Sequence, residues 1–183
     1  AAKISDMNQT DKNGEYKAGM DATDEDMYVV GNGLPKFTAS WSNYLKYKNL
    51  DLSIYFRGAF GFEIFNIHEF YYGIPGMTSN VMKTAYTKNA NIKENPLVCD
   101  YFIERGDYLK LDMVTIGYTI PLVSKYFDSV RFSLTGKNLF TLTSFSGVDP
   151  STYSTNGLTP GATGSRNYYP TCRQFLAAVQ IAF

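Results

Sequence analysis

The chain has 183 residues, in which 17 Lys and Arg balance 17 Asp and Glu, so its formal net charge is zero. A neutral chain presents no net field that would recruit nucleic acid or anionic lipid. Aromatic residues reach 16%, with 15 Tyr and 13 Phe, a level typical of the aromatic girdles of membrane barrels and of sugar- or peptide-binding surfaces. The sequence contains no apolar run of the length that a transmembrane helix requires.

Residues 1–36 are polar, acidic and punctuated by glycine, so we expect a long loop. Asp6, Asn8 and Thr10 have the oxygen-rich spacing of a calcium loop. Asp11, however, stands where an EF-hand requires Gly, so the sequence fails that template. We therefore favour a solvated acidic loop over a bound ion, and we expect no metal and no cofactor.

Two strands of alternating polarity are predicted next, at 37–47 and 50–62, with a tight turn at Lys48–Asn49 between them. The first has eleven residues, the length of a tilted strand that crosses a membrane. The second carries Asp51 and Arg57 on its polar face and no charge on its apolar face. This distribution suits a wet lumen better than a packed core.

Residues 63–106 read as a long irregular segment, with a short helix expected near Val81–Thr87. His68 is the single histidine of the chain. Because it has no second histidine and no nearby cysteine, we expect a surface or packing role rather than metal ligation.

Residues 107–143 are predicted to form a strand pair. The first strand ends at Pro121, and the second runs from Val130 to about Thr143. The apolar residues of the first strand change phase at Asp112–Val114, which indicates a β-bulge.

A loop rich in Gly, Ser, Thr, Pro and Tyr is expected at 144–170, followed by a terminal strand at 171–183. Apolar residues occupy every second position from Phe175 to Phe183, whereas Gln174 and Gln180 lie on the other face. A half-buried strand of a soluble sheet could have this pattern, but a strand of a transmembrane β-barrel must have it.

Short and long connections alternate strictly between the five expected strands. Outer-membrane barrels alternate short periplasmic turns with long extracellular loops, so we expect the loops at 1–36, 63–106 and 144–170 to be extracellular. Five strands cannot close such a barrel, and an open sheet would leave two bare edges. We therefore expect an all-β chain that is the C-terminal part of a larger transmembrane antiparallel β-barrel.

Four stretches resemble motifs of the SusC/RagA family of TonB-linked outer-membrane proteins. Y-F-I-E-R-G-D-Y-L-K-L-D-M-V-T-I-G-Y-T-I-P is similar to the family's F-x-E-D-G-S-Y-L-R-L-K-N-V-T-L-G-Y-T-L-P, and G-K-N-L-F-T-L-T-S-F-S-G-V-D-P to its G-x-N-L-F-T-x-T-x-Y-x-G-x-D-P. V-G-N-G-L-P-K-F and the terminal Y-P-T-C-R-Q-F-L-A-A-V-Q-I-A-F resemble two further motifs, I-G-N-x-x-P-K-F and Y-P-x-x-R-x-F-x-x-G-x-x-x-x-F. The motifs occur in family order from Val30 to Phe183. The family's usual D-x-N-G-D-G is missing before Val30, which weakens a metal site further.

The resemblance implies that the chain is the last five or so strands of a 22-stranded TonB-dependent transporter in the outer membrane of a Gram-negative bacterium of the Bacteroidetes. Such transporters import oligosaccharides or peptides, are covered by a SusD-like lipoprotein lid and are energised by TonB through an N-terminal plug. Membrane lipid and the barrel assembly machinery are further implied partners. Phe183 sits where the resemblance places the aromatic residue read during assembly.

The sequence has no nucleophile–base pair and no phosphate loop, so we expect no enzyme activity and no nucleic-acid partner. Two alternatives to import remain. One is a non-transporting barrel, such as an adhesin or structural protein. The other is a secreted glycan-binding β-domain.

Five loop tyrosines are candidates for facing substrate or lid, although loop aromatics also commonly pack without a ligand. They are Tyr71, Tyr72, Tyr153, Tyr168 and Tyr169. Cys99 and Cys172 could form one disulfide. Their strands are not neighbours, however, so we favour two free thiols unless the loop at Cys99 folds back.

Overall fold

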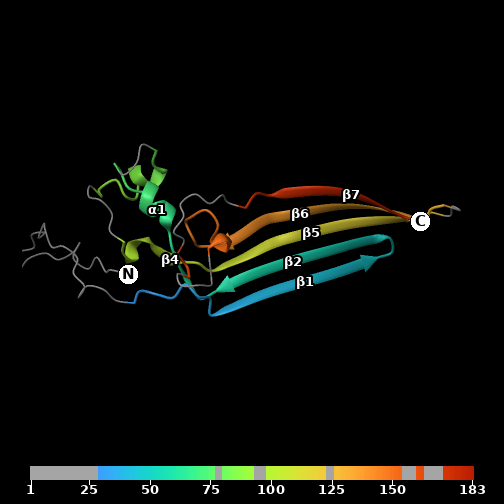
Figure 1. Ribbon diagram of the computed structural model, residues 1–183, viewed down its shortest axis with the longest axis horizontal. Helices are drawn as coiled ribbons and strands as arrows, with labels where there is room; N and C mark the ends of the chain where they lie inside the picture. Colours follow the sequence, from blue (N-terminus) through green and yellow to red (C-terminus); the bar gives the residue numbers. More distant parts are fainter. Residues whose placement is uncertain (1–28, 77–79, 93–97, 123–125, 154–159, 163–170) are drawn as a thin grey trace, which may run out of the picture.

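The computed structural model describes residues 29–76, 80–92, 98–122, 126–153, 160–162 and 171–183. Its five long strands form one antiparallel sheet in the order β1-β2-β5-β6-β7 (Figure 1). The strands are β1 (Phe37–Tyr47), β2 (Leu50–Phe60), β5 (Tyr108–Pro121), β6 (Ser129–Thr143) and β7 (Gln174–Ala182). All five expected strands are present, and their ends differ from the prediction by a few residues. β1 and β7 are the edges of this sheet.

The stretch expected to be irregular contains more regular structure than the sequence indicated. A 3₁₀ helix at Lys83–Tyr86 confirms the short helix. The structure adds α1 (Ile67–Tyr72) and a small antiparallel pair formed by β3 (Glu63–Phe65) and β4 (Ile103–Arg105). Strands of three residues are too short for alternating polarity to be visible in the sequence. Further 3₁₀ turns lie at Asp100–Phe102 and Pro150–Thr152.

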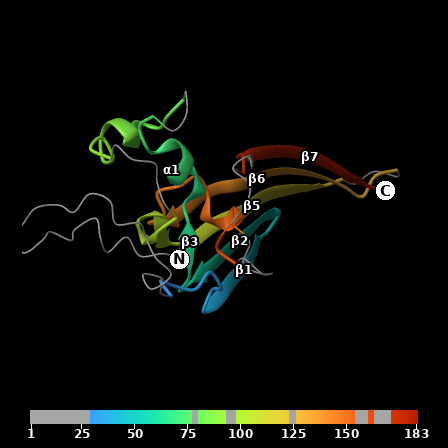
Figure 2. The ribbon, with the colours of Figure 1, turned by 60° about the vertical axis from the view of Figure 1, so that its left-hand side comes forward.

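The short connections between strands lie at one end of the sheet, and the long connections lie at the other. Figure 1 shows the β1–β2 and β5–β6 turns at one end, together with the C-terminus of the chain. Thr119 and Asp128 donate backbone hydrogen bonds to Asn49 and Ala182 at this turn end, with N–O distances of 2.8 and 2.9 Å. The long connections gather at the opposite end, and Figure 2 shows α1 and β3 there. We call this the loop end of the sheet.

One face of the sheet is apolar across all five strands. The strand register aligns its residues in rows, of which one contains Tyr47, Leu50, Tyr118, Phe132 and Val179. These side chains are exposed, at 43 to 72% of their surface. An exposed apolar face of this extent is typical of a sheet that meets lipid or a partner rather than water.

Asp112 forms the bulge that the phase change predicted. Tyr55 pairs with Met113 but Phe56 pairs with Leu111, so Asp112 has no partner residue on β2. The extra residue returns Leu111 to the apolar face, which Val114 and every second residue after it occupy. It leaves Met113 on the polar face, because successive side chains of a strand alternate.

Two small cores lie at the loop end. We call α1, β3, β4 and the connecting segments at this end the loop layer. The first core joins the sheet to the loop layer and contains Ala59, Phe62, Ile64, Tyr108, Phe145 and Tyr153. The second lies under α1 and contains Ile74, Cys99 and Phe102. Within the described residues, no helix combines the length and apolar character needed to cross a membrane.

Candidate functional site

The polar face of the sheet carries an ionic cluster near the turn end. Arg131 on β6 donates two hydrogen bonds to Asp51 on β2, from Nε to Oδ1 at 3.0 Å and from Nη2 to Oδ2 at 2.6 Å. Its Nη1 donates to Gln180 Oε1 on β7 at 3.0 Å. Gln180 thus lies on the polar side, opposite the apolar residues of β7, as predicted.

Gly117 makes the contact between Arg131 and Asp51 possible. β5 lies between the strands of the two side chains. A Cβ at Gly117 would come within 2.3 Å of Arg131 Nη2 and 2.6 Å of the Asp51 carboxylate oxygens. The absence of a side chain therefore opens a passage across β5.

A second ion pair lies on the same face at the bulge. Arg57 Nε is 2.6 Å from Asp112 Oδ2, and the two side chains are 38% and 20% exposed. The bulge residue therefore points to the polar face, where its charge meets an opposite charge. Both ion pairs lie on the face that the sequence predicted to be polar.

The most buried ion pair lies at the loop end, where Lys110 is only 1% exposed. Its Nζ donates to Asp149 Oδ2 at 3.1 Å, to Ser151 Oγ at 3.1 Å and to Thr171 Oγ1 at 3.0 Å. Burial alone raises the pKa of the Asp149 carboxyl. Hydrogen bonds from Thr171, Ser151 and Lys110 outweigh burial and hold this pKa below its usual value.

Two further carboxylates organise the loop layer. Glu104 accepts hydrogen bonds from Ser146 N at 2.8 Å, Ser146 Oγ at 2.7 Å and Asn66 Nδ2 at 2.9 Å. Glu69, which is 3% exposed, accepts from Asn89 Nδ2 at 2.8 Å and from Thr84 Oγ1 at 3.1 Å. These hydrogen bonds connect α1 and β4 to the segments around them, so they fix the arrangement of this part of the molecule.

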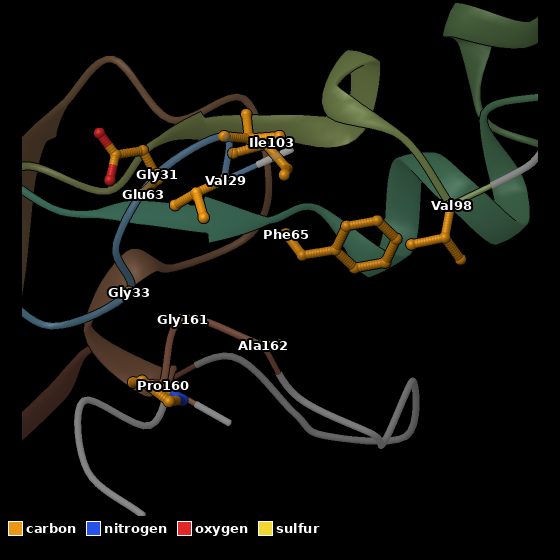
Figure 3. Close-up of a pocket in the computed structure, with 11 residues that line it drawn as sticks. Val29, Gly31, Gly33, Glu63, Phe65, Val98, Ile103, Pro160, Gly161 and Ala162 are labelled. Carbon is orange, nitrogen blue, oxygen red and sulfur yellow. The ribbon is translucent and has the colours of Figure 1, made fainter. Parts of the chain in front are cut away.

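An apolar cavity of about 650 Å³ opens between several segments of the loop layer (Figure 3). Phe65 and Ile103 line it from β3 and β4, Val98 from the stretch before β4, and Gly33 and Pro160 from two loops. Gly33 cannot accept a side chain, since a Cβ there would be 2.0 Å from Pro160 O. The cavity can receive apolar groups, and Glu63 is the charged residue at its margin.

The structure separates the tyrosine candidates. Tyr71 and Tyr72 lie half-buried on α1, where Tyr71 makes an edge contact with Phe70 at 5.0 Å. Tyr153 is 4% exposed and packs edge-on against Phe145 at 5.5 Å, which fits the packing alternative for this residue. Tyr153 is therefore not accessible to a substrate or a lid. Tyr168 and Tyr169 lie outside the described residues.

The remaining candidates are at different ends of the molecule. Cys99 is buried in the core under α1, Cys172 is exposed, and no disulfide joins them. Burial raises the pKa of the Cys99 thiol. His68 lies on α1, where burial lowers its pKa. Phe183 is 90% exposed at the turn end. Among the described residues, no group of three or more His, Cys, Asp and Glu could hold a metal.

Sequence reasoning missed the Lys110–Asp149 pair, although a signal for part of it was present. The sequence D-P-S-T at Asp149–Thr152 has an N-capping residue followed by proline at the first helical position. Asp149 Oδ1 indeed accepts from Ser151 N at 2.9 Å. Nothing local to Asp149 indicates that its other carboxylate oxygen meets a buried lysine from another strand.

No family model matches the chain. Two curated proteins of Formosa agariphila are similar in sequence. TonB-dependent receptor P3 is 29% identical over 157 residues, which cover 77% of this chain and 16% of that protein. TonB-dependent receptor P26 is 29% identical over 196 residues, which cover 94% of this chain and 19% of that protein. The chain thus spans less than a fifth of the length of these relatives.

Solved structures of the RagAB system share the fold. A structure of the RagAB peptide transporter aligns with a TM-score of 0.71 and 20% identity over 96% of this chain and 20% of that one. The RagAB peptide importer in its closed-closed state aligns with a TM-score of 0.67 and 19% identity, over 100% of this chain and 21% of that one. The chain is thus similar in sequence to TonB-dependent receptors and in fold to the RagAB structures, and both similarities support the resemblance of its four motifs to the SusC/RagA family.

Proposed function

We propose that the chain supplies barrel wall and extracellular loops to an outer-membrane importer of peptides or oligosaccharides that is driven by TonB and covered by a SusD-like lipoprotein. The observation that carries this proposal is the two-faced sheet. An apolar face runs across all five strands, whereas the opposite face carries the Arg131–Asp51, Arg57–Asp112 and Lys110–Asp149 pairs. Lipid on one side and a water-filled lumen on the other account for both faces.

RagAB is a peptide importer, which favours peptides as the first substrate class to test. The names of the curated relatives describe receptors rather than enzymes. We accordingly propose no catalytic role for this chain. The barrel assembly machinery, TonB and membrane lipid are the other partners that the proposal requires.

The uptake test uses the complete receptor in its native host. Cells carrying or lacking the receptor gene would be supplied with fluorescent tryptic peptides of casein and, separately, with labelled maltodextrins. We expect receptor- and TonB-dependent uptake of one of the two probes. A receptor that assembles in the membrane but imports neither probe would contradict the proposal and favour an adhesin or structural barrel. Solubility of the protein without detergent would favour the secreted glycan-binding domain.

We further propose that the turn at Lys48–Asn49 and the 122–128 connection face the periplasm, and that the loop end faces outward. Support comes from the separation of short and long connections to opposite ends of the sheet (Figure 1). An epitope tag at Asn49 should be inaccessible to antibody on intact cells, whereas a tag beside Tyr86, which is 73% exposed at the loop end, should be accessible. Surface labelling of the Asn49 tag would reverse the topology.

The lid contact can be tested at α1. We propose that loops at the loop end touch the lipoprotein, because they are long and rich in aromatic residues, which interfaces favour. Deletion of residues 71–76 should reduce recovery of the lipoprotein with the receptor in a pull-down, relative to a receptor with Tyr126→Ser at the turn end. Unchanged recovery would count against this contact.

A further inference from the structure

We propose that residues 145–153 form a fixed ledge over the polar face at the loop end, which contacts substrate as it enters, and that Lys110 is the residue that positions this ledge. The inference rests on the proposed import function and adds to it a substrate-facing segment and the group that holds it.

The ledge lies on the polar face of the wall. Phe145 and Tyr153, at its two ends, share a buried core with Ala59 of β2 and Tyr108 of β5. Ala59 and Tyr108 pair across the strands, two pairs away from Arg57 and Lys110 in the register. Because alternate residues share a face, Tyr108 and Lys110 point to the same side of β5. The segment between Phe145 and Tyr153 therefore covers the face that carries the ion pairs.

The ledge is held by hydrogen bonds to charged groups on both sides of its tip, which is formed by Gly147 and Val148. Ser146 is bound to the Glu104 carboxylate through its backbone N–H and its hydroxyl. On the other side, Asp149 is bound to Lys110 and to Thr171, which precedes β7. Hydrogen bonds to ionised groups are the stronger kind, so two such anchors a few residues apart define one position of the tip.

Lys110 has no hydrogen-bonding capacity left for a substrate. An ammonium group has three N–H donors, and those of Lys110 are used by Asp149, Ser151 and Thr171. The side chain is also almost fully buried. Lys110 therefore acts through the ledge as a positioning residue and does not bind substrate itself.

Val148 is the part of the ledge that is free to meet substrate. It is 50% exposed, whereas Asp149 and Pro150 beside it are buried. Val148 also lines a cavity of about 170 Å³ between the ledge and β6, together with Thr141 and Lys110. The tip thus combines an exposed side chain with a neighbouring polar recess.

The burial of this ion pair indicates a geometric role. Replacement of a buried ion pair by apolar residues of similar volume is often neutral or stabilising, so such pairs are weak evidence for stability. We therefore expect Lys110→Met/Asp149→Leu to leave the barrel folded while the ledge loses its fixed position. The matched control is Arg57→Met/Asp112→Leu, which removes the other ion pair of β5, a pair without hydrogen bonds to the ledge.

The first experiment measures the ledge itself in the complete receptor. A nitroxide spin label would be attached at Val148→Cys after Cys172→Ser, because Cys172 is exposed and Cys99 is buried. We expect restricted label motion in this background and in the Arg57/Asp112 control, and a several-fold shorter correlation time with Lys110→Met/Asp149→Leu. Equal label motion in all three proteins would overturn the positioning role of Lys110.

The second experiment tests contact with substrate. A photo-crosslinking amino acid at position 148 would be irradiated in cells given biotinylated tryptic peptides of casein or biotinylated maltodextrins. We expect capture of the probe that the receptor imports, reduced several-fold by Lys110→Met/Asp149→Leu and absent with the crosslinker at Tyr126. Import without capture at position 148 would refute the ledge contact and leave the import function standing. If neither probe is imported or captured, the import function fails and the substrate contact of the ledge fails with it.

Discussion

Substitution of Gly117 by alanine should break the ionic cluster at the turn end. The added Cβ would stand 2.3 Å from Arg131 Nη2 and 2.6 Å from the Asp51 oxygens. Ordinary contact of such atoms begins near 3.4 Å, so the guanidinium would have to retreat by about 1 Å. This retreat would lengthen the 2.6 Å hydrogen bond beyond hydrogen-bonding range.

The alanine variant should therefore resemble a variant that lacks the guanidinium. Arg131 connects β6 to β2 and, through Gln180, to β7, so its displacement removes side-chain links among three strands. We expect Gly117→Ala to lower the temperature at which the folded barrel loses its heat-modifiable mobility on gels. In an Arg131→Met background the same substitution should have less than half of that effect, because the group that it displaces is gone.

The assay is a double-mutant cycle with Gly117→Ala, Arg131→Met and both together, each in the complete receptor. A control substitution Lys137→Met, on the same face of β6 but four residue pairs away from Gly117, should be additive with Gly117→Ala. Equal effects of Gly117→Ala with and without Arg131 would refute this reasoning, because the cost would then come from the β5 backbone and not from the displaced ion pair.

Three further outcomes are expected. Removal of Phe183 should lower the amount of assembled barrel, measured by heat-modifiable mobility, far more than it lowers uptake per assembled molecule. Burial of one such side chain contributes only about 1.5–3 kcal/mol, too little to unfold an assembled barrel. Normal assembly with lost uptake would contradict this. Cys172 should react with iodoacetamide in the folded protein, and Cys99 only after unfolding, because Cys99 is buried and burial raises its thiol pKa. An intact mass that shows no alkylation until reductant is added would indicate a disulfide. The spin label at position 148 should stay restricted as pH falls to the usual carboxyl pKa and should gain motion only below it. The pKa of Asp149 is depressed in the folded state. The stabilising contribution of its carboxylate is therefore present above the unfolded pKa and is lost as pH falls through the folded pKa. Release of the label at neutral pH would contradict the role of the Asp149 carboxylate in holding the ledge.

Local patterns explain what the sequence could predict. Alternating polarity identified β1 with the bounds that the structure has, and the change of phase in β5 located the bulge at Asp112. Both signals depend on neighbours along one strand. α1 was missed, although Asn66 accepts a capping hydrogen bond from Glu69 N and Gly73 follows the helix. A helix of one or two turns leaves too little periodicity to be recognised.

Exposure and long-range partners could not be predicted in this way. Tyr71 and Tyr153 are both loop tyrosines in the sequence, yet one lies half-buried on α1 and the other is inside a core. The packing of Tyr153 depends on Ala59 and Tyr108, which belong to other strands. Burial is a property of such neighbours, so composition alone cannot assign it.

The sequence by itself determined the strands, the two faces of the sheet and the alternation of short and long connections, because each follows from spacing along the chain. The tertiary structure alone decided which charges meet. Arg131 and Asp51 are 80 positions apart and come together only because β5 presents a glycine between their strands. Lys110 and Thr171 are 61 positions apart and meet only where the chain after β6 folds back over the polar face. Pairing at such separations is fixed by the register of the assembled sheet, which single strands do not contain.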